Sequence, residues 1–532
     1  MRSFIEKRPL VFLLSLAFLL RLIAVFFAKG YMMHDDHFLT VEPSGSWSDG
    51  YNFNEWMPGV GNDRTSPEPI SFFYLFFLFS FFKFFNLIGI EHPDTQMYLM
   101  RFIHASYSLM TVYLSYRITE RISNKRDAFH VGLLLAILAI IPNFSVRNLV
   151  EFVCMPPLLY GVWLLVKHNA FHFINYRLPW GNSSLTLQDS FSPQLRVSWK
   201  ILVLAAFVMG IAVGIRYQTG LFVACVGFVF FLQKEYSRFL LFGVISFVAF
   251  FVTQVDDVIL WGGKPFQHLQ GYFGYNAKNA LNYPGSPFAY LSFIAYFILP
   301  PVSLFLLFGF IREWKRFFFI VFPVIAFVLF HFWYPNRQER FILPILPFFI
   351  IIGVIGWHRF YVQSIFWSKR SSLYAFCIGF FMLVNLVGLA VLSTIYSKKA
   401  RVEAMLYLYN QGDCKNFIQE FTQGESGSQV PQFYSGNWQW YYVFRKSSSV
   451  EAEVAMMEEV ALQQRGTLDP KEVPNYILFY NEDQLDERVE RMKKYFPTLE
   501  YCTRISPGWF DKLLHELNDK NSLETVFIYK MP

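Results

Sequence analysis

Residues 9–28, PLVFLLSLAFLLRLIAVFFA, form the stretch that decides the fold class. An α-helix needs about 20 consecutive apolar residues to cross the hydrocarbon core of a bilayer, and this stretch has that length. It follows a short basic segment, Arg2–Arg8, and this order is typical of an uncleaved first span whose basic end stays in the cytoplasm. The sequence therefore predicts an integral membrane protein.

The composition of the whole chain agrees with this prediction. Of the 532 residues, 54% are hydrophobic, 20% aromatic and only 16% charged, whereas roughly a quarter of a soluble domain is charged. A soluble enzyme is excluded because too few charges remain to cover its surface, and disorder is excluded by the aromatic content. The net charge of +7 does not indicate a nucleic-acid partner, since membrane proteins concentrate Lys and Arg near the cytoplasmic face.

We expect about twelve apolar segments of this kind along the chain. They cover residues 9–28, 70–88, 97–118, 129–143, 152–167, 199–215, 218–233, 237–255, 289–309, 317–334, 341–357 and 372–396. Clusters of Lys and Arg lie between them and should face the cytoplasm. These clusters are Arg2–Arg8, Arg117–Arg126, Arg196–Lys200, Lys234–Arg238, Arg312–Arg316 and Arg359–Arg370.

The Phe-rich segment 70–88 is the exception among the expected spans. An odd number of apolar segments lies between the first two basic clusters, yet an even number of crossings must separate two cytoplasmic clusters. We therefore predict that 70–88 is re-entrant or lies on the membrane surface. The expected architecture is a polytopic α-helical membrane domain over residues 1–396, with about eleven transmembrane helices.

A change of composition after Ser397 predicts a second domain over residues 397–532. Short apolar strands, Tyr476–Tyr480 and Thr525–Tyr529, flank a charged helical run, Asp486–Tyr495, as in a small α/β domain. The expected topology places this domain on the lumenal or periplasmic side. Its two cysteines, Cys414 and Cys502, could pair if that compartment is oxidising.

The same topology places the polar loops 29–69 and 256–287 on the outer side. We find no internal repeat, and the ionisable groups are not expected at the bilayer midplane, where a secondary transporter would hold them. A catalytic site at the membrane surface is the better prediction.

The first outer loop contains an adjacent acidic pair, Asp35–Asp36. Two neighbouring carboxylates repel each other, which raises the proton affinity of one of them and suits a general base. His34 and His37 flank the pair, and such a group could also ligate Mn²⁺ or Zn²⁺. An ordinary solvated acidic loop is the third interpretation.

This loop resembles that of a known enzyme family. The stretch DDHFLTVEPS, residues 35–44, is similar to the D-E-x-F-Q-x-x-E-P-A pattern that follows the first span of polyprenyl-phosphate-mannose-dependent mannosyltransferases, which form glycosyltransferase family 22 of the GT-C superfamily. An ungapped match places Asp35 on the catalytic Asp of the family and Asp36 on its acidic neighbour. Matching His34 to the family His instead shifts the catalytic position to Asp36, so both remain candidates.

Further elements of the family pattern follow in order along residues 1 to about 350. They are Asn54-Glu55-Trp56, Arg64 to Ser66, Arg147 to Glu151, Arg216-Tyr217-Gln218, Asp256-Asp257, Pro265-Phe266, Tyr275-Asn276, and WYPNRQERFILPILPF over residues 333–348. The last resembles H-K-E-E-R-F-x-x-P-x-x-P and retains Arg337, Glu339 and Arg340, whereas the family His is replaced by Asn336.

The resemblance implies a GT-C fold and an inverting transfer of mannose from a β-linked polyprenyl phosphate donor. It implies one Asp as the base, Asp35 or Asp36, and no metal or cofactor besides the donor substrate. Arginines would hold the leaving phosphate, because a guanidinium makes planar bidentate contacts with phosphate oxygens. The remaining substrate-binding candidates complete the set: Arg147, Arg216, Arg337, Arg340, Glu151, Glu339, Glu55, Arg64, Trp56, Asp256, Asp257, Tyr275 and Asn276.

The expected acceptor is a hydroxyl of a lipid-linked glycan or glycolipid. Two other functions remain open: a GT-C transferase that uses another polyprenyl-linked sugar or a protein acceptor, and a transporter of lipid-linked glycans without chemistry. The bacterial inner membrane is the favoured location, with the endoplasmic reticulum as the alternative.

Overall fold

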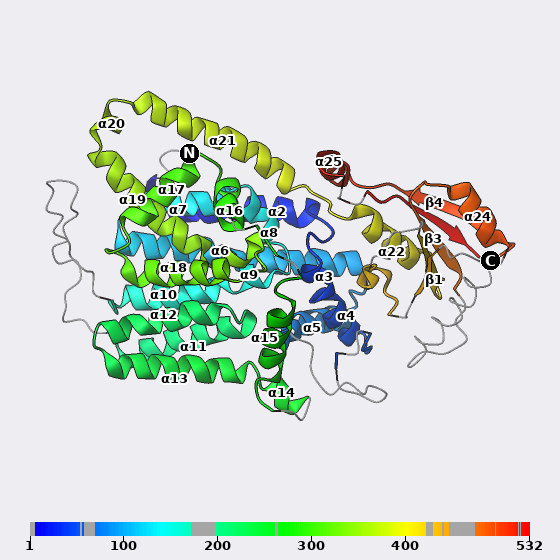
Figure 1. Cartoon of the computed structure of the whole chain (residues 1–532), viewed down its shortest axis with the longest axis horizontal. Coiled ribbons are helices and arrows are strands. Elements are labelled where there is room, and N and C mark those ends of the chain that lie inside the picture. The colour runs from blue at the N-terminus through cyan, green and yellow to red at the C-terminus, as the bar shows by residue number, and fades with distance from the viewer. Residues whose placement is uncertain are drawn as a thin grey trace. The chain divides into compact units, whose positions relative to one another are not determined.

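The computed structural model (Figure 1) describes residues 6–53, 56–57, 70–171, 197–260, 264–282, 284–286, 288–421, 429–438, 441–445, 474–494, 496–519, 521 and 523–531. The chain forms two compact units. The first comprises Met1–Phe26, Ser66–Tyr74 and Arg101–Thr394. The second comprises Phe27–Thr65, Leu75–Met100 and Ile395–Pro532.

The first unit is helical. Its elements, with α2 and α6 shared in part with the second unit, are α2 (Pro9–Phe27), α6 (Pro93–Ile122), α7 (Lys125–Ile137), α8 (Ile140–Phe144), α9 (Val150–Val153), α10 (Met155–Lys167), α11 (Trp199–Ile215), α12 (Thr219–Leu232), α13 (Tyr236–Val252), α14 (Asp256–Ile259), α15 (Gln267–Asn279), α16 (Ala289–Phe297), α17 (Val302–Arg312), α18 (Phe318–Trp333), η1 (Glu339–Ile345), α19 (Leu346–Gln363), α20 (Ile365–Ser368) and α21 (Ser371–Leu392). Helices α10 to α13 lie side by side (Figure 1).

Length and hydropathy select candidate membrane spans among the described helices. Five stretches are long and apolar enough to cross a bilayer: Pro9–Phe27, Val150–Lys167, Tyr236–Ile259, Glu339–Gln363 and Ser371–Leu392. Shorter apolar helices are Phe72–Leu87, Trp199–Ile215, Thr219–Leu232, Val302–Arg312 and Phe318–Trp333. The chain is thus an integral membrane protein, as its composition predicted.

The predicted segments 289–309 and 129–143 are wrong as single helices. Residues 289–309 were expected to form one apolar span, but they form α16 and the start of α17. The break contains Pro300 and Pro301, whose nitrogens have no hydrogen to donate to the helical ladder. The predicted segment 129–143 is likewise divided, into α7 and α8.

Small residues allow the helices to approach closely. A Cβ added at Gly309 of α17 would lie 2.1 Å from the carbonyl oxygen of Gly353 in α19, and one at Gly356 would lie 2.1 Å from the oxygen of Gly309. Apolar side chains gain little by leaving lipid for another apolar surface, so close backbone packing supplies much of the helix association in membranes.

The buried Arg21 ties three helices together. It lies in the middle of α2 and is 1% exposed. Its Nε donates to Ser108 Oγ on α6 at 2.7 Å, and its terminal nitrogens donate to the carbonyls of Ala17 at 3.2 Å and Leu135 at 3.3 Å. These acceptors offset the cost of placing a guanidinium inside an apolar helix bundle.

The second unit combines helices with a five-stranded sheet. Its elements are α3 (Asp35–Phe38), α4 (Val41–Ser48), α5 (Phe72–Leu87, shared in part with the first unit), α22 (Lys399–Gln411), β1 (Phe417–Phe421), η2 (Gln432–Ser435), β2 (Tyr442–Arg445), β3 (Tyr476–Tyr480), α24 (Leu485–Lys493), β4 (Glu500–Ile505), α25 (Trp509–Leu517) and β5 (Val526–Lys530). The strand order is β2-β1-β3-β5-β4.

The predicted strands of the tail are confirmed. β3 and β5 pair antiparallel, with Ile477 opposite Tyr529, and β1 runs parallel to β3 on its other side. Helix α24 packs on the sheet through Val489 and Met492. Within the predicted helical run, α24 ends at Lys493, and Tyr495 lies outside the described residues. Cys414 and Cys502 are both free thiols, so the pairing considered for them is not formed.

Candidate active site

Helix α3, in the second unit, places the two carboxylates of the acidic pair in different surroundings. The side chain of Asp35 is 46% exposed, whereas Asp36 is only 4% exposed. The Asp36 carboxylate turns back on the chain and accepts hydrogen bonds from the backbone N–H groups of Met32 and Met33, both at 3.3 Å. Successive residues of a helix point about 100° apart, so one carboxylate faces inwards and its neighbour faces water. Asp35 is therefore the accessible member of the pair.

His37 and Glu42 hold this short helix in place. The His37 ring nitrogen Nε2 lies 2.8 Å from Glu42 Oε1, and both side chains are buried. The imidazole is stacked between Tyr31 and Tyr434, with ring centroids 5.0 and 5.5 Å away. Glu42, which stands at the Glu of the D-E-x-F-Q-x-x-E-P-A pattern when DDHFLTVEPS is matched to it without gaps, thus supports the fold of the loop.

The C-terminal part of the chain completes this support. Both oxygens of Glu42 lie 3.2 Å from the backbone nitrogen of Phe433 in η2. Gly30 forms a parallel bridge with Ser397, and a Cβ at Gly30 would lie 1.9 Å from the Ser397 oxygen. Within the second unit, residues after Ser397 therefore position the aspartate segment.

His34 lies beside the exposed carboxylate. Its Nδ1 is 3.7 Å from Asp35 Oδ1, and its Nε2 is 2.9 Å from Gln429 Oε1. The nearby Asp35 carboxylate raises the pKa of His34 above its ordinary value of 6.5. A positive charge beside Asp35 is thus favoured over a wider pH range than for a free imidazole.

Of the other candidates in this loop, only Trp56 can be placed, and it is buried, with 7% exposed. Glu55 and Arg64 lie outside the described residues.

A second group of candidates converges inside the first unit. Glu151 of α9 is 2% exposed, and its Oε1 lies 3.0 Å from Arg216 Nη1 and 3.8 Å from Arg340 Nε. Arg216 directly follows α11, and Arg340 is the second residue of η1, so three separate segments meet at one carboxylate. Two guanidinium groups around one carboxylate leave an excess positive charge.

Arg216 has unused hydrogen-bonding capacity. The residue is 7% exposed, and within the described part of the chain its Nε and Nη2 have no hydrogen-bond partner. Buried donors are normally satisfied, so these groups are available to an anion. Arg147 is also buried, in the turn that precedes α9.

Arg337 and Glu339 do not join this group. Arg337 donates to the backbone carbonyls of Phe332 at 2.8 Å and Gly285 at 3.1 Å, and it thereby connects the segment after α18 to the loop before α16. Glu339 is exposed. Although Arg337 and Arg340 are close in sequence, only Arg340 approaches Glu151.

Helix α15 contributes a residue that the sequence analysis missed. Tyr272 is hydrogen-bonded to Gln218, two residues beyond Arg216. Its ring lies 5.3 Å from that of Tyr217. The predicted neighbours behave differently: Tyr275 is 55% exposed, and Asn276 Nδ2 donates to the Tyr272 carbonyl at 2.8 Å. The sequence did offer one signal for Tyr272, because this residue lies one helical turn before the predicted Asn276.

The predicted pair Asp256 and Asp257 contacts a histidine that the sequence analysis also missed. Asp257 accepts the backbone N–H of Gln267 at 2.7 Å and that of His268 at 3.2 Å, and it is hydrogen-bonded to the His268 ring. It therefore caps the N-terminus of α15. Within the described ranges, these two aspartates and His268 are the one group of three such side chains with the spacing of metal ligands.

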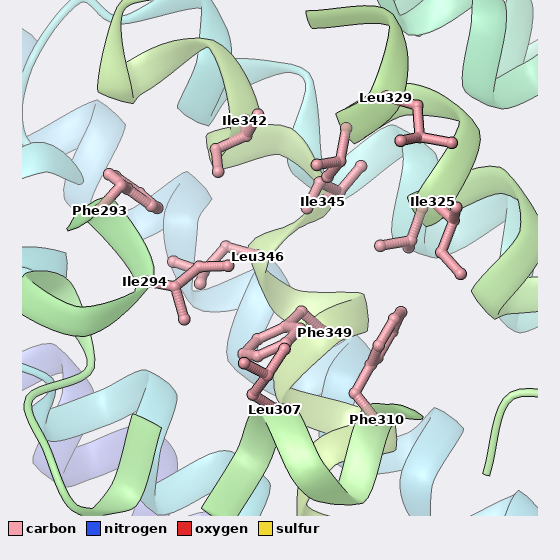
Figure 2. A pocket seen from close by; sticks show the side chains of 12 residues that line it. Phe293, Ile294, Leu307, Phe310, Ile325, Leu329, Ile342, Ile345, Leu346 and Phe349 are labelled. Atoms are coloured by element: carbon pink, nitrogen blue, oxygen red, sulfur yellow. The ribbon is translucent and has the colours of Figure 1, made fainter. Parts of the chain in front are cut away.

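An apolar cavity of about 150 Å³ lies in the same unit. Figure 2 shows side chains from α16, α17, α18, η1 and α19 around it, including Phe293, Phe310, Ile325 and Phe349. Helix η1 supplies Ile342 and Ile345 to the wall and carries Arg340 near its start. One short helix thus bears both a cationic and an apolar contact surface.

The family model of Alg9-like mannosyltransferases matches residues 11–424. The chain belongs to the Alg9-like mannosyltransferase family. It is therefore a glycosyltransferase, and specifically a mannosyltransferase, as the loop pattern around Asp35 predicted. The matched residues include Asp35 and Asp36 as well as the group formed by Glu151, Arg216 and Arg340. No curated protein matches the sequence significantly.

Solved structures confirm the fold of this family member. ArnT from Cupriavidus metallidurans bound to undecaprenyl phosphate has a TM-score of 0.53 at 11% identity, with 97% of each chain covered. AglB from Archaeoglobus fulgidus, in complex with an inhibitory peptide and a dolichol-phosphate, has a TM-score of 0.56 at 12% identity, with 94% of this chain and 74% of AglB covered. This Alg9-like mannosyltransferase thus has the predicted GT-C fold.

Proposed function

We propose that this protein is an inverting glycosyltransferase that moves mannose from a polyprenyl-phosphate-mannose donor to a hydroxyl of a lipid-linked glycan or glycolipid. The transfer takes place at the outer face of the membrane and needs no cofactor besides the donor. The bacterial inner membrane is the proposed location. The observation that carries the proposal is the exposed Asp35 beside a buried Asp36, in a chain whose family is that of mannosyltransferases.

Asp35 is the proposed general base. In a single displacement the acceptor oxygen bonds to the anomeric carbon, the bond from that carbon to the phosphate oxygen breaks, and the hydroxyl proton passes to Asp35. A carboxylate in this role contributes roughly 10²–10⁴-fold to the rate. Asp36 is unsuited to it, because its oxygens already accept two backbone hydrogen bonds.

Arg216 and Arg340 are the proposed partners of the donor phosphate. Negative charge accumulates on the leaving phosphate, and fixed cations stabilise that charge. Supporting this role are the unpaired Nε and Nη2 of Arg216 and the excess of guanidinium groups around Glu151. The apolar cavity beside η1 suits isoprenoid units, and ArnT and AglB are solved with polyprenyl-type phosphates.

The test measures transfer of labelled mannose from synthetic mannosyl polyprenyl phosphate into a lipid extract that supplies acceptors. Asp35→Asn should lower kcat while donor binding persists. Arg216→Met should raise KM for the donor, and the matched control Arg117→Gln should leave both constants unchanged, because Arg117 is a half-exposed residue paired with Glu120 one helical turn away. Unchanged transfer by both Asp35→Asn and Asp36→Asn would exclude the proposal.

Two comparisons separate this function from its alternatives. In the first, the assay is repeated with glucosyl or arabinosyl polyprenyl phosphate in place of the mannosyl donor. A preference for either of these donors would mean that the protein is a GT-C transferase for another sugar. A transporter would move labelled lipid-linked glycan across proteoliposomes equally well with Asp35→Asn. Family membership favours the mannosyl donor over both alternatives.

A further inference from the structure

We infer that Asp256, Asp257 and His268 form a binding site for one divalent cation that joins α14 to the first turn of α15. Each residue offers one ligand atom, and these atoms lie within 4.8 Å of one another. A set of two carboxylates and one imidazole suits Mn²⁺ or Zn²⁺. This site is separate from the residues assigned to the transfer step.

The three residues are buried together. Asp256 is 8% exposed, Asp257 0% and His268 1%. Asp256 Oδ2 lies 3.5 Å from His268 Nδ1, and Asp257 Oδ1 is in contact with the same nitrogen. Ligands at about 2.1 Å from one ion lie roughly 3 Å apart, so small shifts would bring the three atoms into one coordination shell.

Asp256 supplies the observation that points to a ligand. Its Oδ2 has no hydrogen-bond partner among the described residues, although the side chain is nine-tenths buried and directed at the His268 ring. A buried carboxylate oxygen without a donor is costly, and a cation removes that cost. Asp257 needs no such partner, because it already accepts two backbone N–H groups and contacts the imidazole.

The net charge of the three side chains is an independent reason to expect a cation here. Within the described ranges, no Lys or Arg forms an ion pair with Asp256 or Asp257, so two carboxylates share a single imidazole. If both carboxylates are ionised, even a protonated imidazole leaves one negative charge uncompensated in a buried position. A divalent cation with a neutral imidazole brings the group to zero net charge.

The pair Asp127 and His358 is the matched comparison in the same unit. Here one carboxylate faces one histidine, with Oδ1 and Nδ1 2.7 Å apart. The second oxygen of Asp127 accepts hydrogen bonds from Ser123 at 2.5 Å and Asn124 at 2.9 Å. This pair is satisfied by its neighbours and offers no surplus carboxylate to an ion.

The experiment uses the full chain, purified in detergent without a polyhistidine tag and freed of metal with EDTA. MnCl₂ or ZnCl₂ is added alone, excess is removed, and bound metal is counted by mass spectrometry, with Mn²⁺ also followed by electron paramagnetic resonance. We expect about one ion per chain in the wild type and in Asp127→Asn. Asp256→Asn and His268→Gln should each weaken Mn²⁺ affinity by at least ~10-fold.

Two results would overturn the inference: no stoichiometric metal on the wild type, or equal retention by Asp256→Asn, His268→Gln and Asp127→Asn. Elution as a single monodisperse species checks that each variant is folded. If Asp256→Asn aggregates, His268→Gln and the wild-type titration still decide the question, because either can contradict the site. Mannosyl transfer is not the readout, so the result is independent of the proposed function.

Discussion

The two Asp-Asp pairs of the chain have the same sequence but opposite surroundings. Asp35–Asp36, in the second unit, is divided by burial: the first carboxylate faces water and the second accepts backbone hydrogen bonds. Asp256–Asp257, in the first unit, is buried as a whole around His268. The dipeptide alone therefore does not specify a chemical role.

The role of an aspartate in this chain depends on whether water can reach its carboxylate and on which hydrogen-bond donors surround it. A carboxylate that water can reach, held on a rigid helix, can take a proton from a substrate. A buried carboxylate must be satisfied by backbone donors, by an imidazole or by a cation, and it then stabilises local structure.

The largest effect is expected at the exposed carboxylate. Asp35→Asn replaces the proposed base by an amide of nearly the same size, so transfer should fall roughly 10²–10⁴-fold while thermal unfolding changes little. Initial rates with the mannosyl donor and a melting curve in detergent check both parts. Asp49→Asn is the control, since Asp49 accepts from Trp438 at 2.7 Å and has no assigned catalytic role. A wild-type rate for Asp35→Asn would remove the distinction between the two pairs.

Substitutions in the buried pair Asp256–Asp257 should change stability, and the loss should be larger at Asp257 than at Asp256. Asp257→Ala removes the acceptor for two N–H groups of α15 and should lower the free energy of unfolding by about 1–3 kcal/mol. Asp256→Asn keeps the size of the side chain, and Oδ2 of Asp256 accepts no hydrogen bond, so in EDTA this change should cost less stability than Asp257→Ala. Melting curves of both variants without metal test this order, and equal losses would contradict it.

A smaller effect is expected at Asp36. Asp36→Ala leaves the N–H groups of Met32 and Met33 without their acceptor, at a cost of about 1 kcal/mol. Transfer should fall less than with Asp35→Asn, because the base remains. The reverse order of activities would assign the base to Asp36 and exchange the roles within the pair.

The smallest effect is a pH dependence at His34. Contact with Asp35 raises the pKa of His34 above 6.5, so folding favours the protonated ring. The resulting stabilisation is fully present below about pH 6.5 and is lost as the pH rises through the higher folded-state pKa. The half-exposed contact limits it to less than ~0.5 kcal/mol. Melting temperatures of the wild type and His34→Gln from pH 5.5 to 8.5 should converge at the alkaline end, and a constant difference would contradict this.

Much of the fold follows from local sequence. Apolar runs such as 9–28 and 372–396 coincide with α2 and α21 to within a few residues, because length and hydropathy suffice to define a span. The strands Tyr476–Tyr480 and Val526–Lys530 were similarly visible as short apolar runs between polar residues. The division of 289–309 was missed because hydropathy averages over the two prolines between α16 and α17.

Only part of the candidate site could be predicted from the sequence. Arg216, Arg340 and Glu151 were each predicted from their own motifs, but their meeting at one carboxylate depends on three separate segments packing together. His268 and Tyr272 escaped notice because no motif includes either residue, although Tyr272 lies one helical turn before the predicted Asn276. Their importance comes from partners on other elements, Asp257 and Gln218.

Hydropathy and short motifs are properties of contiguous residues, and they were enough to predict a membrane protein that resembles the mannosyltransferases and has an acidic pair after its first span. The accessibility of each aspartate depends instead on the tertiary structure, which exposes Asp35 and buries Asp36, Asp256 and Asp257. Burial and hydrogen bonding depend on what packs against a side chain, and the segments that do so, such as Phe433 against Glu42, lie far away along the chain.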